Sequence, residues 1–95
     1  MNKDYTRTPI SDARNLGPTT AAEMQVMDIH CLEQIQEIGW EDFYIRYVEL
    51  FPHRLNLNAL TAILGAIEDQ DWREVDPQLK AQAKSLIQKI KNGMI

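Results

Sequence analysis

Apolar residues recur along the chain at intervals of three and four, which is the period of an α-helix with one buried face. Leu32, Ile35 and Ile38 are the clearest case, and they predict a helix over 32–38 that Gly39 ends. No stretch alternates with a period of two over enough residues to indicate a β-strand. The pattern therefore predicts an all-α fold, a small bundle of five or six helices.

The next predicted helix, 41–51, is rich in aromatic residues and ends because Pro52 cannot continue the backbone hydrogen bonds. Its inward side is expected to comprise Phe43, Tyr47, Leu50 and Phe51, flanked by Tyr44 and Val48. Its water-facing side comprises Asp42, Arg46 and Glu49.

A fifth helix is predicted over 57–68, with Asn56 as its cap. Its first eleven residues carry no charge, so it should be buried on nearly all sides. Gly65 costs about 1 kcal/mol relative to alanine in a helix, and we expect a neighbouring backbone to cross closely there. The connection over 69–75 should be anchored by Trp72.

The last predicted helix starts at Asp76 and Pro77, a cap followed by a first-position proline, and ends near Lys91. Asn92 and Gly93 supply the stop signal. Its apolar stripe is expected to comprise Leu79, Ala83, Leu86, Ile87, Ile90 and Met94.

The N-terminal part is organised around a turn. Residues 1–9 are polar and aperiodic, so we expect a flexible tail before one helical domain over 10–95. Ser11 is a candidate N-cap for a very short helix over 12–15, which the turn then closes. The helix after the turn, 21–27, is expected to turn inward one of two sets, either Ala21, Met24 and Met27 or Ala22 and Val26.

Thr20 and Glu23 have the spacing of a capping box, in which each side chain satisfies a backbone amide at the other's position. A helix should therefore begin at Thr20, with Asn15 and Gly17 allowing the chain to reverse before it. Backbone amides that converge at such a helix start form a candidate anion site.

Charge is unevenly distributed over the 95 residues, whose net formal charge is −4. Residues 23–50 carry one basic and seven acidic groups, whereas 77–95 carry four lysines and no acid. An acidic chain is a poor candidate for a dedicated nucleic-acid binder, although a local basic strip can still contact phosphate or an acidic protein. No apolar run approaches the roughly 20 residues of a membrane span, and the N-terminus lacks a signal core. We expect a cytoplasmic protein with no membrane partner.

Few residues have the spacing of a catalytic or metal site. His30 and His53 lack metal-ligand spacing, and neither a His-Glu-x-x-His motif nor a phosphate loop occurs. Cys31 is the only cysteine, which excludes an intrachain disulfide and a cysteine-based zinc cluster. The position of Cys31 beside His30 suggests a nucleophile, but adjacent residues at a helix start point in different directions. We therefore interpret Cys31 as a small, partly buried cap-region thiol. We expect no enzymatic activity, no metal and no cofactor.

Three surface or aromatic groups each have two interpretations. The aromatic residues Trp40, Trp72, Phe43, Tyr44 and Tyr47 form either a core, which we favour, or a ligand-stacking face. The acidic residues Glu33, Glu37, Glu41 and Asp42 serve either solvation or the docking of a basic partner. The lysines Lys80, Lys84 and Lys91 lie within about 40° of one another around a helix, and they serve either the helix dipole or a phosphate or partner contact.

The order of residues also points to a family. The segment 13–21 resembles the hairpin of helix-hairpin-helix domains: Ala13-Arg14-Asn15-Leu16-Gly17-Pro18-Thr19-Thr20-Ala21. With Asp28-Ile29-His30, Leu55-Asn56-Leu57-Asn58-Ala59-Leu60, Ala62-Ile63-Leu64-Gly65-Ala66-Ile67 and Trp72, the chain resembles the C-terminal domain of the TfoX (Sxy) family of bacterial competence regulators. The resemblance covers about residues 10–90.

The resemblance implies a cytoplasmic regulatory domain in the control of DNA-uptake genes, usually joined to a separate N-terminal domain. The chain would be either a stand-alone version of the domain or a trimmed piece, and we favour the former because it begins at Met1 with no obvious tag. Its partner would be a protein, either transcription machinery or a separate TfoX N-terminal-type domain, contacted through Glu33, Glu37 and Glu41. The oligomeric state is left open.

The alternative is weak, sequence-independent binding to the DNA backbone through the hairpin turn. The candidate phosphate contacts are Arg14, Asn15, Gly17, Thr19, Thr20, Lys80 and Lys84. DNA-binding hairpins often have glycine where this chain has Asn15 and a basic residue where it has Thr19, so a salt-sensitive phosphate contact should be weakened. Protein contact is therefore the favoured prediction.

Overall fold

The computed structural model of this chain describes residues 8–94. Its five α-helices are α1 (Pro18–Val26), α2 (Leu32–Ile38), α3 (Trp40–Leu50), α4 (Leu57–Ile67) and α5 (Pro77–Lys91). Three short 3₁₀ helices precede or connect them: η2 (Ile10–Asp12), η3 (Pro52–Arg54) and η4 (Trp72–Glu74). Within 8–94 the only β-type pairing is an isolated bridge between Pro9 and Cys31. The predicted all-α fold is confirmed, while the helix-hairpin-helix motif stays an interpretation of the sequence.

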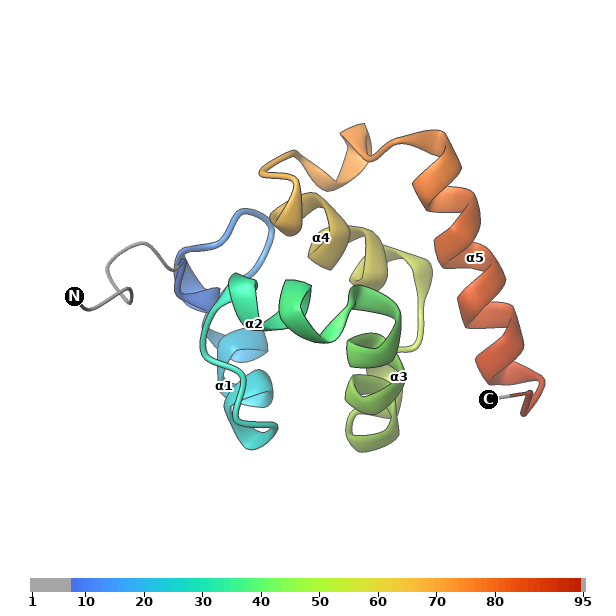
Figure 1. Ribbon diagram of the computed structural model, residues 1–95, viewed down its shortest axis with the longest axis horizontal. Helices are drawn as coiled ribbons and strands as arrows, with labels where there is room; N and C mark the ends of the chain where they lie inside the picture. Colours follow the sequence, from blue (N-terminus) through green and yellow to red (C-terminus); the bar gives the residue numbers. More distant parts are fainter. Residues whose placement is uncertain (1–7, 95) are drawn as a thin grey trace.

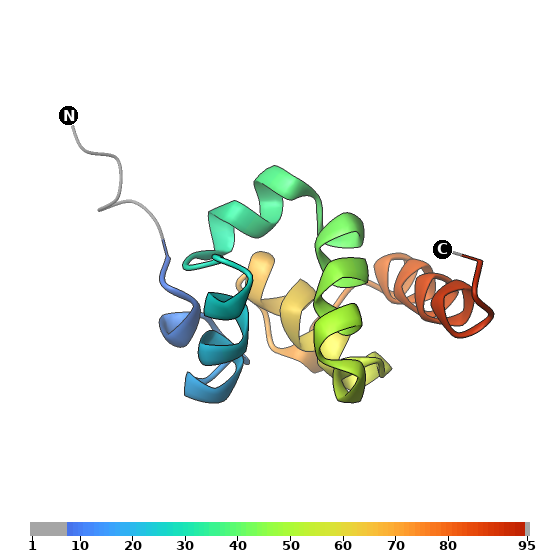
Figure 2. The same cartoon turned by 90° about the horizontal axis from the view of Figure 1, so that it is seen from below.

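Helix α4 occupies the middle of the molecule. It contacts α2, α5 and η4. Figure 1 shows α1 and α5 at opposite ends of the long axis, with α2 and α3 between them. The view from below in Figure 2 shows α1, α3 and α5 side by side, with α2 crossing from the α1 side to the start of α3.

The core contains buried side chains from α2, α3 and α4. Leu60, Ile63 and Leu64 of α4 are almost fully buried, as the uncharged sequence of this helix predicts. The Asn56 cap is confirmed, because its Oδ1 accepts a hydrogen bond from Ala59 N at 2.8 Å. The predicted helix over 32–38 is likewise confirmed in α2. The other almost fully buried large side chains are Ile10, Met24, Ile35, Phe43, Tyr44 and Tyr47.

The close crossing predicted at Gly65 is present. A Cβ atom at this position would lie 2.7 Å from Asn15 Nδ2 and 2.8 Å from the carbonyl oxygen of Gln70. Gln70 N donates to Gly65 O at 2.7 Å, so the chain after α4 folds back directly over the glycine. Only a residue without a side chain fits this crossing without a shift of its neighbours.

The N-terminal segment departs from prediction. No helix forms over 12–15, because Ala13 is extended and Asn15 has a left-handed backbone with φ of 70°. Ser11 lies inside η2 and is not a helix cap. Residues 1–7 of the predicted tail lie outside the described residues, whereas Thr8 N donates to Glu33 Oε1 at 2.8 Å.

Helix α1 buries one of the two predicted sets. Met24 is fully buried, and Ala21 and Met27 pack partly buried against the core. Ala22 and Val26 of the alternative set are exposed. The period of the helix allowed both sets, and the position of the core decides between them.

Three predictions about burial are wrong. Leu50, the last residue of α3, is 55% exposed, while Tyr44 and Val48 are buried. Trp72 is 41% exposed, whereas Val75 in the same connection is buried. Helix α5 has the predicted bounds, with Ala83, Leu86 and Ile87 buried and Leu79 and Ile90 packed beside them, but Met94 follows its end and is exposed.

Candidate functional site

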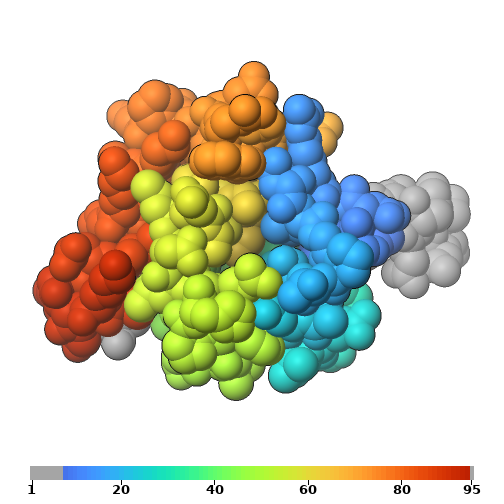
Figure 3. Space-filling model, turned by 180° about the vertical axis from the view of Figure 1, so that it is seen from behind, coloured from blue at the N-terminus to red at the C-terminus, as the bar shows by residue number. Residues whose placement is uncertain are grey.

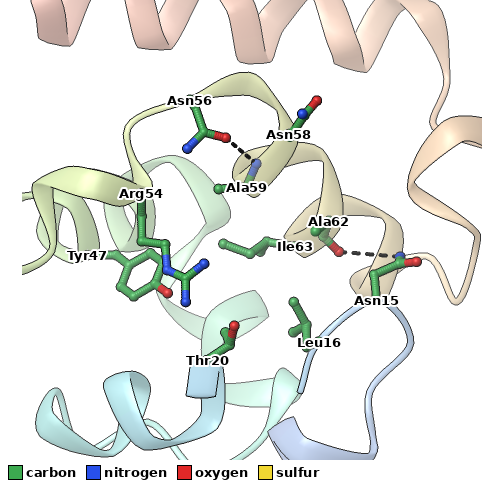
Figure 4. A pocket seen from close by; sticks show the side chains of 10 residues that line it. All are labelled: Asn15, Leu16, Thr20, Tyr47, Arg54, Asn56, Asn58, Ala59, Ala62 and Ile63. Atoms are coloured by element: carbon green, nitrogen blue, oxygen red, sulfur yellow. Dashed lines mark hydrogen bonds between the residues drawn. The ribbon is translucent and has the colours of Figure 1, made fainter. Parts of the chain in front are cut away.

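The turn before α1 is held in place by the side chain of Asn15. Its Nδ2 donates to the carbonyl oxygen of Gln70 at 2.7 Å and approaches that of Ala62 at 3.5 Å. Its Oδ1 accepts from Trp72 N at 3.3 Å. The amide that the sequence offered as a phosphate contact therefore ties the turn to α4 and η4, and Figure 4 shows its contact with Ala62.

Helix α1 begins two residues earlier than predicted, at Pro18. Proline lacks a backbone N–H and suits the first position of a helix, where that donor would have no partner. Gly17 is the N-cap, and no side chain caps the helix. The capping box of Thr20 and Glu23 is therefore wrong.

The carboxylate of Glu23 instead joins α1 to the end of α3 and to η3. It accepts hydrogen bonds from Tyr47 Oη at 2.6 Å and Arg54 Nε at 2.8 Å, and His53 Nε2 lies at 3.1 Å. Its side chain is only 13% exposed. Burial by itself would raise the pKa of Glu23, but the hydrogen bonds and the charge of Arg54 lower the pKa below its ordinary value.

Sequence reasoning missed this cluster, which we call the Glu23 clamp: Glu23, Tyr47, His53 and Arg54. Its members lie 24–31 residues from Glu23 along the chain, so no local motif links them. The charge of Glu23 was explained by a capping box, and the only other signal is the neighbouring pair of basic side chains just after Pro52. Polar residues on separate elements show no sequence motif for such a contact, so the cluster can be recognised only once the fold is known.

Beside the clamp lies a cleft of about 280 Å³. Its lining comprises Asn15, Leu16, Thr20, Tyr47, Arg54, Asn56, Asn58, Ala59, Ala62 and Ile63. Figure 4 shows the Arg54 guanidinium projecting into the cleft opposite Thr20. The apolar side chains of Leu16 and Ile63 line the same space. Because Glu23 already balances the charge of Arg54, the cleft offers little net attraction for an anion.

The candidate DNA contacts fall into two groups. Arg14 and Thr19 are exposed and Gly17 and Thr20 partly buried near the start of α1, whereas Lys80 and Lys84 are on α5. Figures 1 and 3 show the hairpin segment and α5 at opposite ends of the molecule. The structure therefore does not bring the hairpin residues and the α5 lysines together into one surface.

The three acidic candidates also differ from one another. Glu33 is partly buried, and its carboxylate accepts hydrogen bonds from Thr8 N at 2.8 Å and Thr8 Oγ1 at 3.4 Å. Glu37 at the end of α2 and Glu41 at the start of α3 are exposed. We call Glu37, Glu41 and the neighbouring exposed Asp42 the acidic corner.

Cys31 is the N-cap residue of α2, which confirms its interpretation as a cap-region thiol, but it is buried and not partly buried as predicted. Gln34 Oε1 accepts from Cys31 N at 3.1 Å and lies 3.6 Å from its Sγ. His30 is exposed, with Nε2 at 2.9 Å from Asp28 Oδ1. The two neighbouring side chains therefore have different partners. Among residues 8–94, no three His, Cys, Asp or Glu side chains come together as a metal site.

The core interpretation of the aromatic residues is confirmed for Phe43, Tyr44 and Tyr47, which are buried. Phe43 and Tyr47 are stacked with ring centroids 5.4 Å apart. Trp40 is partly buried and packs against the core, while Trp72 is exposed. No shared ligand-stacking face results from these five residues.

No helix in the described part of the chain is both long and apolar enough to cross a bilayer.

The chain was compared with known proteins, solved structures and family models. Neither the curated proteins nor the solved structures contain a match to the chain. The family model of the TfoX C-terminal domain matches residues 6–87, which is most of the sequence. The chain thus belongs to the TfoX C-terminal domain family, as the residues of its hairpin and of α4 had indicated.

Proposed function

We propose that this chain is a non-enzymatic regulatory module that acts in the cytoplasm, in the control of competence or related transcription, by contacting a protein partner. The observation that carries the proposal is its membership in the TfoX C-terminal domain family over residues 6–87. The partner would be transcription machinery or a separate TfoX N-terminal-type domain.

The roles of the polar side chains support a binding function. Asn15 fixes the turn, Glu23 clamps α1 to α3, and Cys31 caps α2. The sequence offered each of these residues as a candidate for chemistry or capping, and each contributes to the fold. The exposed surface of the helices is then the part of the molecule that can contact a partner.

The acidic corner is the proposed contact surface. Glu41 and Asp42 lie in the first turn of α3, where negative charge is favoured by the helix dipole, and Glu37 is exposed at the end of α2. Glu33 belongs to the proposed surface only in part, since its carboxylate also holds Thr8. A basic partner would be attracted to this corner in a salt-dependent manner.

Deletion of the gene in its own host tests the regulatory role through transformation frequency and the transcript levels of DNA-uptake genes. We expect both to change, and to be restored by the wild-type chain but not by Glu37→Lys/Glu41→Lys. Glu68→Lys, an exposed position at the end of α4, is the matched control and should restore both. Unchanged transformation and transcripts after deletion would refute the role; full restoration by the double variant would refute the surface.

Hairpin contact with DNA remains the second candidate, because Gly17 caps α1 without a side chain and leaves its first turn open to an acceptor. Arg14 is the exposed cation nearest to this turn in sequence. A titration with duplex DNA at low salt tests it, since Arg14→Glu should abolish hairpin binding. Binding that is unchanged in this variant would exclude the hairpin.

A further inference from the structure

Helix α5 carries a strip of positive charge. Lys80, Lys84 and Lys91 lie within about 40° of one another around the helix axis at 100° per residue, and we call them the lysine strip. No acidic residue occurs within Pro77–Lys91. Lys84 and Lys91 are exposed, and Lys80 is partly buried. The nearest carboxylates in sequence, Glu74 and Asp76, lie before the helix, and Asp76 caps it.

The strip faces away from the acidic corner. Glu41 shares a cleft with Gln82, Ser85, Leu86 and Lys89, which are therefore on the side of α5 that faces the start of α3. Lys89 is about 160° from the middle of the strip around the helix. The body of α5 thus lies between the strip and Glu41.

Helix α5, which carries the strip, packs against α4. Ala83, Leu86 and Ile87 are buried, and α5 contacts α4 along this apolar face. Along the helix axis, at 1.5 Å per residue, Lys80 and Lys84 are about 6 Å apart and Lys84 and Lys91 are about 10 Å apart. Figure 3 shows α5 forming one edge of the molecule, at the far side from the hairpin segment. A long, straight partner can therefore lie along this edge without meeting the hairpin.

We propose that the lysine strip binds the phosphate backbone of a nucleic-acid duplex, independently of the hairpin. Besides the lysines, the exposed residues on this side of α5 are Pro77, Ala81 and Gln88, while the neighbouring Ile87 is buried. The exposed surface therefore offers cations, an amide donor and small apolar groups. Protein interfaces are depleted in lysine and centred on aromatic or large apolar anchors, and the strip has none. Lysine and glutamine side chains are typical contacts to phosphate oxygens, which carry no sequence information.

Three phosphate contacts predict a weak and strongly salt-dependent interaction. The logarithm of the binding constant should fall with the logarithm of the salt concentration with a slope of about −2.7, from −0.9 per contact. Raising the salt from about 50 to about 200 mM should then weaken binding about 40-fold. Replacement of two strip lysines should reduce the slope to about −0.9 and the weakening to about 3.5-fold.

Fluorescence anisotropy with two unrelated DNA duplexes of about 20 base pairs, with the full chain at up to about 100 µM in low salt, tests the proposal. We expect equal binding to both duplexes, loss in Lys84→Gln/Lys91→Gln, and retention in the matched control Lys89→Gln and in Arg14→Glu. Circular dichroism verifies that each variant folds, and the exposed positions of all four residues make this the expected result.

Several outcomes overturn the proposal. These are no binding of the folded wild type, retained binding in the strip variant, or loss in Arg14→Glu alone, which would place the contact at the hairpin. Displacement of DNA by poly-glutamate of equal charge at equal concentration would identify an acidic protein as the better occupant. None of these results depends on the acidic corner, so the proposed protein contact is tested separately.

Discussion

Replacement of Gly65 by alanine tests the closest backbone crossing in the molecule. The added Cβ would lie 2.7 Å from Asn15 Nδ2, 2.8 Å from the Gln70 carbonyl oxygen and 3.3 Å from Trp72 Cα. Two of these three neighbours are backbone atoms, and the hydrogen bond from Gln70 N to Gly65 O holds that segment against α4. The methyl group can therefore be accommodated only by moving the chain after α4 or the Asn15 amide.

The expected magnitude follows from opposing terms. Forcing an extra methyl into a filled site costs about 1–3 kcal/mol. Alanine regains about 1 kcal/mol of helix propensity relative to glycine. Displacement of Asn15 would also lose hydrogen bonds worth about 0.5–1.5 kcal/mol each. We expect a net destabilisation of about 1–3 kcal/mol, which corresponds to a lowering of Tm by about 4–24 °C in a domain of this size.

Urea and thermal unfolding, followed by circular dichroism and by tryptophan fluorescence, measure this loss. Asn58→Ala is the matched control, because it adds helix propensity at an exposed position of the same helix and should change stability by less than about 0.5 kcal/mol. Wild-type or higher stability of Gly65→Ala with an unchanged m-value would refute the inference that glycine is required by the crossing.

Three further predictions concern side chains that join distant segments. Glu23→Gln should destabilise the fold by about 1–3 kcal/mol at neutral pH, because it removes a charged acceptor with three partners. Because the pKa of Glu23 is lowered in the folded state, its contribution to stability is present above the ordinary carboxyl range and is lost as pH falls through the folded pKa. The difference in urea midpoint between wild type and Glu23→Gln should therefore shrink below about pH 4. A constant difference would contradict the clamp. Asn15→Ala should be less stable than Asn15→Gly by about 1–2 kcal/mol, because both variants lose the amide contacts but only alanine is strained at φ of 70°. Equal urea midpoints of the two variants would count against this account. Burial, opposed by a backbone hydrogen bond from Asn56, raises the pKa of Tyr44 to about 12. The stability contributed by the neutral phenol is therefore present below about pH 10 and is lost as pH rises toward 12. Stability titrations should show a smaller alkaline loss in Tyr44→Phe than in wild type, and parallel curves would speak against the buried phenol.

The helices themselves were accessible from the sequence because their signals are local. The Asn56 cap acts on the amide three residues later, Asp76 acts two residues later, and Gly39 ends α2 through its own backbone. Apolar spacing within one or two turns fixed the buried side of α2 and most of α5. The same local signals carried the family resemblance that the match over residues 6–87 confirmed.

Local signals misled where a residue had two possible partners. Glu23 has capping-box spacing to Thr20, yet three donors on α3 and η3 take its carboxylate. Leu50 and Trp72 are apolar at positions where the period or the connection suggested burial, but neighbouring elements do not cover them. Burial depends on what lies opposite a side chain, and no residue nearby in sequence specifies that.

The turn from Asn15 to Gly17 depends both on its local sequence and on the tertiary structure. Sequence by itself determined that the chain reverses here, since asparagine and glycine permit backbone conformations that other residues resist. Only the tertiary structure decided what the Asn15 amide does, because its partners at Gln70 and Trp72 are 55 and 57 residues away. It likewise placed the α5 lysines at the opposite end of the molecule from the turn. Local sequence fixes backbone choices within a few residues, whereas the assignment of a polar side chain to structure or to a surface requires the packing of the whole chain.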